Sequence, residues 1–350
     1  MNEYNYKSYE SIIRWFSGKK LNFLVTGAAG FIGTNLVLKL LELGQNVTGA
    51  DNFLTGKRSN IALINELHAK VAKDADERKG GNFSFIECDL RDINECRRIT
   101  AGIDFVFHEA GLGSVPWSLE DPLLFHADDD TAFFNILNAS KENAVKKLIY
   151  ASSSAVYGTC KKLPAVENKI GGQVSMYASA KLTNEIYAKT FYNVFGFESI
   201  GFRYFNIYGD FQDPDSKYAA VIPAWIKNIL GGKTFIVNGD GKTTRDFCYV
   251  DDVVKINLLG VIADKKYAEG SVYNAASGSS VTLKDLAEML VRLLNSNVKY
   301  EFGPFRQGDI KYSAADITKA KNDLGYFPGS TLEEGLEKSL NWYKKVLKIH

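Results

Sequence analysis

Short apolar runs alternate with helical stretches over the first 205 residues, and this alternation limits the possible folds more than any other feature of the sequence. Brief apolar runs that end in turn residues are typical of buried parallel strands. Six such runs occur, at 21–27, 46–51, 83–87, 104–108, 147–153 and 198–205, and helical periodicity occurs at 31–43, near 131–143 and at 177–194. The alternation predicts an α/β fold with a doubly wound parallel sheet.

The pattern changes after about residue 207, where glycine, proline and aspartate become frequent and shorter elements follow. We therefore expect two domains of discontinuous sequence: a doubly wound domain of residues 1–207 and about 243–276, and a smaller mixed α/β lobe of about 208–242 and 277–350. A short leader helix is predicted before the first strand by four side chains at helical spacing, Tyr9, Ile12, Ile13 and Phe16.

The charge balance argues against a nucleic-acid binder that works through a basic surface. The chain has 42 Lys and Arg against 41 Asp and Glu, a formal net charge of +1. It has no run of about 18 apolar residues, so we expect no membrane span. The first 20 residues lack the apolar core of a signal peptide. We expect a cytoplasmic protein with reduced thiols and no metal site, because the spacing of the cysteines matches no zinc pattern: Cys88, Cys96, Cys160 and Cys248.

A glycine-rich turn joins the first strand to the first helix and predicts dinucleotide binding. Gly27 permits the tight turn, Gly30 lets the backbone approach a pyrophosphate, and Gly33 lets the helix lie close to the strand. The N-terminus of the helix then offers free N–H groups to the phosphates. Asp51 ends the second strand, where a carboxylate accepts hydrogen bonds from ribose hydroxyls and repels a 2′-phosphate. NAD is therefore the expected cofactor.

A second candidate site combines a tyrosine, a lysine and a run of serines. Tyr177 and Lys181 lie four residues apart on a predicted helix, so their side chains share one face. A free tyrosine has a pKa near 10, but a nearby ammonium together with an oxidised nicotinamide can lower it until the phenolate serves as a base. Ser152, Ser153 and Ser154 end the fifth strand, at the edge where α/β enzymes bind their ligands.

The Gly-x-x-Gly-x-x-Gly spacing, the serine run and Tyr-x-x-x-Lys together resemble the extended short-chain dehydrogenase/reductase superfamily. The resemblance covers roughly residues 20–345 and is strongest to the UDP-N-acetylglucosamine 4-epimerase subgroup of the sugar-nucleotide epimerases. It implies that Ser153, Tyr177 and Lys181 are catalytic, with Ser153 indicated by the Val-Tyr-Gly that follows at 156–158. It also implies that the doubly wound Rossmann domain binds NAD and that the smaller lobe binds the sugar nucleotide.

Other segments carry the same resemblance. Residues 108–111 are similar to an H-x-A-A segment beside the cofactor, 203–209 to R-Y-F-N-x-x-G, and 306–309 to R-x-G-D near the diphosphate. The cofactor-binding residues that this implies are Gly27, Gly30, Phe31, Ile32, Gly33, Asp51, Asn52, Asp89, Leu90, His108, Ala110, Tyr177, Lys181 and Tyr204. The implied substrate-binding residues are Gly113, Ser114, Ser153, Ser154, Tyr177, Asn206, Ala220, Val221, Trp225, Ile236, Asn238, Arg245, Arg306, Asp309 and Ser313.

The resemblance also narrows the reaction. Dehydratases of the superfamily carry Asp-Glu directly after the catalytic hydroxyl residue, whereas Ser154 and Ala155 stand there in this chain. Neither side chain moves a proton as a carboxylate does. We therefore expect reversible C4 epimerisation through a 4-keto intermediate. Tyr177 takes the C4 hydroxyl proton with Ser153 bridging, NAD takes the hydride, and both are returned after the sugar has turned.

Ser313 bears on which sugar is used. In the resembling epimerases a tyrosine at this position restricts the pocket to glucose and galactose, whereas a small residue admits an N-acetyl group beside C2. We predict action on UDP-GlcNAc and UDP-GalNAc, with weaker action on UDP-Glc and UDP-Gal. The steric argument leaves open an epimerase for UDP-Glc and UDP-Gal or for UDP-N-acetylhexosaminuronic acids. A non-catalytic NAD-sensing protein is a distant alternative, because such proteins usually lose the tyrosine that this chain keeps.

Two positions depart from the family pattern. Asp129 stands where the family usually has an asparagine with a structural role, and Trp117 stands where the subgroup has an arginine. The resemblance further implies a homodimer with a four-helix interface, a UDP-sugar as the other partner, and no nucleic acid or membrane. Side chains that suit this interface, or equally the core, are Phe133, Phe134, Leu137, Tyr187 and Phe191.

Overall fold

The computed structural model describes residues 3–74, 81–305 and 311–347. Seven parallel strands form a central sheet in the order β10–β6–β5–β4–β1–β2–β3, so the order reverses between β1 and β4. The strands are β1 (Asn22–Thr26), β2 (Asn46–Asp51), β3 (Phe83–Glu87), β4 (Phe105–His108), β5 (Lys147–Ser153), β6 (Ser199–Tyr204) and β10 (Glu269–Ala275). The predicted doubly wound α/β fold is confirmed.

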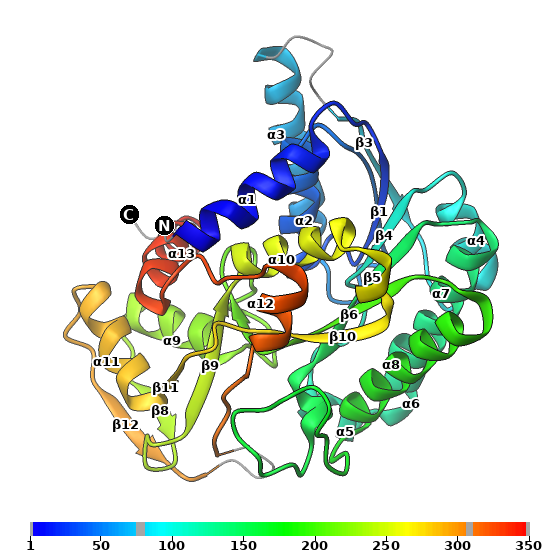
Figure 1. Cartoon of the computed structure of the whole chain (residues 1–350). Coiled ribbons are helices and arrows are strands. Elements are labelled where there is room, and N and C mark those ends of the chain that lie inside the picture. Colours follow the sequence, from blue (N-terminus) through cyan, green and yellow to red (C-terminus); the bar gives the residue numbers. More distant parts are fainter. Residues whose placement is uncertain (1–2, 75–80, 306–310, 348–350) are drawn as a thin grey trace.

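Helices cover both faces of the central sheet (Figure 1). One layer holds α1 (Glu3–Phe16), α2 (Phe31–Glu42), α3 (Arg58–Asp74) and α10 (Val250–Ile262). The other holds α4 (Ile93–Thr100), α5 (Val115–Glu120), α6 (Pro122–Phe125), the π-helical turn η1 (His126–Thr131), α7 (Ala132–Glu142) and α8 (Met176–Phe195). A short 3₁₀ turn, η2 (Ser154–Tyr157), follows β5, and another, η3 (Lys265–Tyr267), precedes β10. No helix in the described ranges is long and apolar enough to cross a membrane.

A smaller mixed α/β lobe lies at the lower left of Figure 1. It contains two small sheets, one of β7 (Asn206–Tyr208), β9 (Thr244–Tyr249) and β11 (Ser280–Thr282), the other of β8 (Phe235–Asn238) and β12 (Tyr300–Gly303). Its helices are α9 (Val221–Leu230), α11 (Leu283–Leu293) and α13 (Leu332–Val346), while α12 (Thr318–Leu324) contacts β10 and α10. The apolar faces of α9, α11 and α13 form a separate core with these strands. The residue ranges predicted for the two domains remain a prediction.

The six strands predicted from apolar runs are present, and three of them, at 46–51, 83–87 and 147–153, have the predicted bounds. The seventh strand, β10, was not predicted as a strand. It is an edge strand with a glycine and several polar side chains, so it lacks the apolar run of a buried parallel strand. The leader helix is present as α1, where Ile12 and Phe16 are buried and Ile13 is exposed.

A buried ion pair fixes helix α8 to the sheet. Arg203 on β6 donates from Nε to Glu185 Oε1 at 2.8 Å and from Nη2 to Glu185 Oε2 at 2.7 Å. Ser152 Oγ on β5 donates to the same carboxylate at 2.6 Å. Because Arg203 and Glu185 are both almost fully buried, removing either partner leaves an uncompensated charge in the interior. This contact ties the middle of α8 to β5 and β6.

Replacing Glu185 by alanine should therefore lower the free energy of unfolding by about 3–5 kcal/mol. The matched control is Glu142→Ala, which removes a solvent-accessible Arg–Glu pair between helices α4 and α7 and should cost less than about 1 kcal/mol. Urea unfolding followed by circular dichroism measures both. Equal losses in the two variants would contradict a fold-anchoring role for Glu185.

Candidate active site

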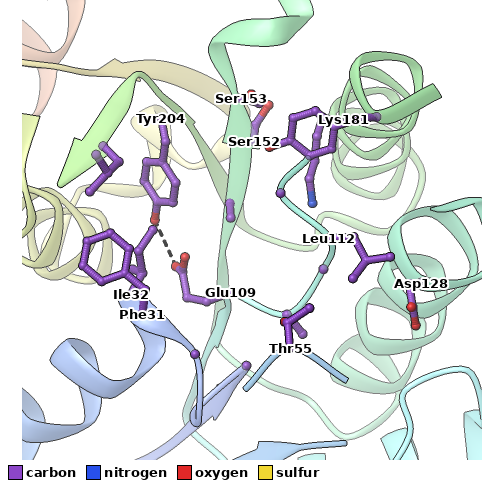
Figure 2. A pocket seen from close by; sticks show the side chains of 18 of the residues that line it. Phe31, Ile32, Thr55, Glu109, Leu112, Asp128, Ser152, Ser153, Lys181 and Tyr204 are labelled. Atoms are coloured by element: carbon purple, nitrogen blue, oxygen red, sulfur yellow. Dashed lines mark hydrogen bonds between the residues drawn. The ribbon is translucent and has the colours of Figure 1, made fainter. Parts of the chain in front are cut away.

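A cleft of about 790 Å³ opens at the carboxyl edge of the central sheet. Most of its lining comes from the residues that end β1 to β6 or directly follow them, and from the first turns of α2 and α8. The cleft spans the point where the strand order reverses, which is where doubly wound proteins bind ligands. Figure 2 shows Ser153 and Lys181 on one side of this cleft and Ile32, Glu109 and Tyr204 on the other.

The turn between β1 and α2 has the geometry of a phosphate cradle. Gly27 has a φ of +69°, and a Cβ there would lie 2.7 Å from the nitrogen of Ala110. A Cβ on Gly33 would lie 2.1 Å from the Gly27 carbonyl oxygen, so both positions require glycine. Among the described residues no side chain caps α2, and Phe31 and Ile32 line the cleft. The N–H groups of this first turn are thus placed to bind an anion.

Asp51, at the end of β2, lines the cleft next to this turn. Its Oδ2 accepts from the Ala29 N–H at 3.0 Å and its Oδ1 accepts from the Phe53 N–H at 2.7 Å. Burial raises the pKa of this carboxyl above its ordinary value, and the two backbone donors only partly offset that. The carboxylate is therefore held in place at the cleft, next to the predicted cofactor residues Asn52 and Asp89.

Ser152 and Ser153 at the end of β5 and Ser154 at the start of η2 all line the cleft, but their hydroxyl groups have different hydrogen-bond partners. Ser152 Oγ donates a hydrogen bond to the Glu185 carboxylate. Ser153 Oγ accepts from the Ala155 N–H at 3.1 Å and forms a hydrogen bond with Tyr177. Of the two buried hydroxyls, only that of Ser153 is in contact with the tyrosine, which supports its selection from the sequence.

Tyr177 and Lys181 lie one turn apart at the start of α8, which Ser175 caps by accepting from the Ala178 N–H at 3.1 Å. The Lys181 Nζ lies 5.8 Å from the centre of the Tyr177 ring. Burial raises the pKa of Tyr177, and Lys181 and the hydrogen bond with Ser153 lower it by less. The lysine on its own therefore does not produce the phenolate.

The lysine has a buried acidic partner that the sequence did not reveal. Asp129, on η1, accepts from Lys181 Nζ at 2.9 Å through Oδ1, and the same oxygen accepts from the Leu112 N–H at 3.3 Å. Both side chains are almost fully buried. The carboxylate raises the pKa of Lys181 despite the burial that opposes it. The family resemblance assigned this position a structural role only, so a side-chain contact with Lys181 was not anticipated.

A second cavity of about 540 Å³ lies in the smaller lobe. It shares Asn206, Ile207, Gln212 and Arg245 with the first, so these four residues form the junction between the two. The predicted substrate residues that line this second cavity are Asn206, Ala220, Val221, Trp225, Ile236, Asn238 and Arg245. One elongated ligand could therefore reach from the smaller lobe to Tyr177 through the junction.

The remaining predicted residues fall into four groups. Ser313 lines the first cavity, and its N–H donates to the Thr244 carbonyl at 3.2 Å, which fixes it beside Arg245. His108 and Ser114 do not line either cavity: the His108 Nδ1 lies 2.9 Å from Thr26 Oγ1 in the interior, and Ser114 caps α5. Arg306 and Asp309 lie outside the described residues. The other predicted cofactor- and substrate-binding residues line one or both cavities.

Comparison with known proteins identifies the family. The model of the NAD dependent epimerase/dehydratase family matches residues 23–276. The chain belongs to this family.

Solved structures with the same architecture include three UDP-sugar 4-epimerases. A UDP-N-acetylglucosamine 4-epimerase from Methanobrevibacter ruminantium, in complex with UDP-N-acetylmuramic acid, is 35% identical with a TM-score of 0.84 and covers 94% of this chain and 99% of its own. A UDP-glucose 4-epimerase from Thermotoga maritima with UDP-glucose is 33% identical, with a TM-score of 0.83 and coverages of 93% and 100%. A UDP-glucuronic acid 4-epimerase from Bacillus cereus with UDP-glucuronic acid and NAD is 29% identical, with a TM-score of 0.81 and coverages of 93% and 100%.

NAD is the cofactor of this epimerase family, and the first cavity fits it. The glycines of the β1–α2 turn leave a cradle that a Cβ would fill, and the Asp51 carboxylate stands at the end of β2. Every residue predicted to bind the cofactor, except His108, lines the cavity. The side chain of His108 is instead part of the interior, where burial lowers its pKa to about 3 and keeps the imidazole neutral.

Glu109 is a cavity-lining acid that motif reasoning passed over, because it occupies the variable position of the H-x-A-A segment. Tyr204 donates to its Oε1 at 2.9 Å, as drawn in Figure 2, and Asn257 donates to the Tyr204 hydroxyl at 2.7 Å. Its Oε2 is shielded from solvent and has no partner among the described residues. Burial raises the pKa of Glu109 to about 8. The epimerase therefore holds this carboxyl protonated, and so uncharged, at neutral pH.

The raised pKa of Glu109 predicts a pH-dependent stability. The folded protein binds a proton there that the unfolded chain releases near pH 4.5, so the stabilisation is lost as the pH rises towards about 8. Glu109→Gln removes this dependence. The melting temperature of the variant minus that of the wild type should therefore be about 2–4 °C larger at pH 9 than at pH 6. Differential scanning fluorimetry measures it, with the exposed Glu301→Gln as control. A constant difference across pH would contradict a protonated Glu109.

Proposed function

We propose that this UDP-sugar 4-epimerase interconverts UDP-GlcNAc and UDP-GalNAc, and acts more weakly on UDP-Glc and UDP-Gal. The observation that carries the proposal is the small side chain of Ser313 in the lining of the catalytic cleft. Backbone bonds from Ser313 to Thr244 hold this position beside Arg245, so a larger side chain there would project into a space of fixed size. A hydroxymethyl group leaves that space for the N-acetyl group at C2.

The charges of the lining favour a sugar with an uncharged C6 group. Of the described residues that line the two cavities, the cationic ones are Lys181 and Arg245. Lys181 is paired with Asp129, and Arg245 lies at the junction where the diphosphate is expected. Among these described lining residues a uronic acid carboxylate would therefore find no cation of its own, and burying it unpaired is costly. Hexosaminuronic acids are thus the second candidate rather than the first.

We assign the proton transfer to Tyr177. When bound, oxidised NAD accepts the C4 hydride of the sugar and later returns it. The Tyr177 phenolate takes the proton of the C4 hydroxyl, and Ser153 bridges the two oxygens through its hydrogen bond with Tyr177. Lys181 keeps two of its three N–H donors for other partners, because the described contact with Asp129 uses one. Those donors suit the hydroxyls of the nicotinamide ribose.

Inversion at C4 requires that the sugar turn while the nucleotide stays fixed. The junction offers strong diphosphate contacts, since Arg245 supplies guanidinium donors and Asn206 is itself fixed by a 3.0 Å bond from Nδ2 to the Asp246 carbonyl. The walls that the sugar faces are largely apolar or small, with Val115, Pro116 and Val174 among them. Loose contacts around the sugar and firm contacts to the diphosphate allow the 4-keto sugar to present its other face.

Ser313→Tyr should reverse the substrate preference. We expect conversion of UDP-GalNAc to fall about 10–100-fold, because the phenol occupies the space of the N-acetyl group, while conversion of UDP-Gal is largely kept. Ser313→Ala keeps the space and should keep the wild-type preference. Purified protein is incubated with each nucleotide sugar, without added NAD, and the products are separated. A wild type that converts only UDP-Gal, or a tyrosine variant that loses both substrates equally, would contradict the proposal.

We also propose that the enzyme is a homodimer that pairs through α7 and α8. From the sequence, Phe133, Leu137 and Phe191 suited either the interface or the core. The structure buries all three in the core. Phe134 on α7 and Ile186 on α8 are instead exposed, and the Phe134 ring packs edge-on to Tyr187 at 5.1 Å. Two neighbouring helices that expose apolar side chains in this way suit a four-helix interface.

Ile186→Glu should convert such a dimer to a monomer, because it places a charge in the apolar contact. Ile13→Glu on α1 is the matched control, since Ile13 is exposed to the same extent, 57% against 56% for Ile186, but lies on another face. Light scattering coupled to size-exclusion chromatography gives the mass of each. A monomeric wild type, or a dimer in both variants, would overturn this assignment.

A further inference from the structure

Asp129 places a buried carboxyl group directly on Lys181; burial raises the pKa of this carboxyl, and the Lys181 ammonium opposes that rise. The pair is joined at 2.9 Å, and the exposed fractions of the two side chains are 0% and 5%. Its geometry is permitted by Gly111, which has a φ of +139° and lies against both groups. A Cβ at Gly111 would come within 2.4 Å of the Asp129 Oδ1 and 3.0 Å of the Lys181 Nζ. Asp129 departs from the asparagine of the resembling family, and it meets Gly111, the last residue of the segment similar to H-x-A-A, at this contact.

The other titratable groups near Lys181 do not carry this charge. Glu109, which follows β4, is held protonated at neutral pH by burial, since its pKa is raised to about 8. His108 on β4 is neutral, because its pKa is lowered to about 3. Asp130, the next residue on η1, has His126 as its partner at 3.2 Å. Asp129 is therefore the acid that offsets the ammonium of Lys181.

The partial compensation of the Lys181 charge by Asp129 affects the pKa of Tyr177. Lys181 favours the phenolate and Asp129 disfavours it, and the tyrosine lies close to both, with its ring centre 5.8 Å from Nζ. A unit charge about 4–6 Å away shifts a pKa by about 1–3 units in a protein interior. Asp129 therefore offsets part of the help that the lysine gives to deprotonation, although Lys181 remains the stronger of the two influences on the pKa of Tyr177.

We propose that Asp129 is a positioning residue of this epimerase, which fixes the Lys181 ammonium beside Tyr177 and offsets its charge, and thereby sets the pH above which the Tyr177 base is available. The proposal rests on the catalytic roles assigned above to Tyr177 and Lys181. It extends these roles by naming Asp129 as the group that weakens the effect of Lys181 on the pKa of Tyr177. An asparagine at this position would keep the hydrogen bond and lose the charge.

The test compares Asp129→Asn with the wild-type holoenzyme. The acid limb of kcat/KM against pH should move to lower pH by about one unit or more, because the phenolate forms more easily without the carboxylate. Below the acid limb this shift appears as a roughly tenfold higher rate. A titration of tyrosinate by ultraviolet difference absorbance should show the same displacement without any turnover. An unmoved limb, or a limb moved to higher pH, would overturn the proposal.

Asp130→Asn is the matched control. It removes a carboxylate one residue along η1 that makes no direct bond to Lys181, so it should leave the acid limb in place. Circular dichroism confirms the fold of each variant. Asp129→Ser, which removes the charge with a smaller side chain, gives the same measurement if the amide variant does not fold. Equal shifts in the Asp129 and Asp130 variants would mean a general charge effect and would overturn the specific role.

Tyr177→Phe separates failure of this proposal from failure of the proposed function. It should abolish the activity and remove the titrating component from the difference spectrum. If the phenylalanine variant still epimerises UDP-sugars, the role of Tyr177 itself is wrong and the role of Asp129 falls with it. If Tyr177→Phe is inactive and Asp129→Asn leaves both titrations unmoved, only the inference about Asp129 is wrong.

Discussion

The bond between Glu185 and Arg203 is the contact on which the geometry of the site depends. Helix α8 carries Tyr177, Lys181 and Glu185 at successive turns, so one anchored carboxylate places the other two side chains. The anchor joins three elements, because β6 supplies Arg203 and β5 supplies Ser152 to the same carboxylate. Ser153, the next residue on β5, then faces the tyrosine. A buried charge is costly unless it is fully paired, and here the pairing also fixes the distance from base to serine.

The two cavities are formed by different parts of the molecule, the central sheet and the smaller lobe. Parallel strands bring the residues that follow them to one edge, which gives the first cavity its cofactor cradle and its catalytic side chains. The smaller lobe adds a second cavity, whose junction with the first contains Asn206 and Arg245. Under the proposed function, the UDP group would be held mainly by the smaller lobe and its junction, and the proton would be transferred in the first cavity. Firm binding at the junction does not have to restrict the sugar, and an epimerase that turns its substrate needs that independence.

Much of this could be predicted from sequence. Apolar runs predicted the strands, the glycine turn predicted the dinucleotide cradle, and Tyr177 with Lys181 predicted a helix face that lines the cleft, because each depends on residues that are close together in the chain. The edge strand β10 was missed because its side chains are mixed and only pairing with β6 defines it. Glu109 and the contact of Asp129 with Lys181 were missed because they join residues 95 and 52 positions away in the sequence. His108 was placed in the cleft by its motif, although its ring lies in the interior.

The pairing of Lys181 with Asp129 also affects folding, because it lowers the free-energy cost of burying the Lys181 ammonium. An ammonium buried without a partner costs several kcal/mol, and the protein must fold with this lysine in the interior. A carboxylate at 2.9 Å offsets part of that cost, and the protonated Glu109 adds no further charge. The same carboxylate, however, opposes formation of the tyrosine base, as burial does. If Tyr177 is the base, as proposed, charge compensation that favours folding weakens the effect of Lys181 on it, and the positive charge of oxidised NAD would supply the rest.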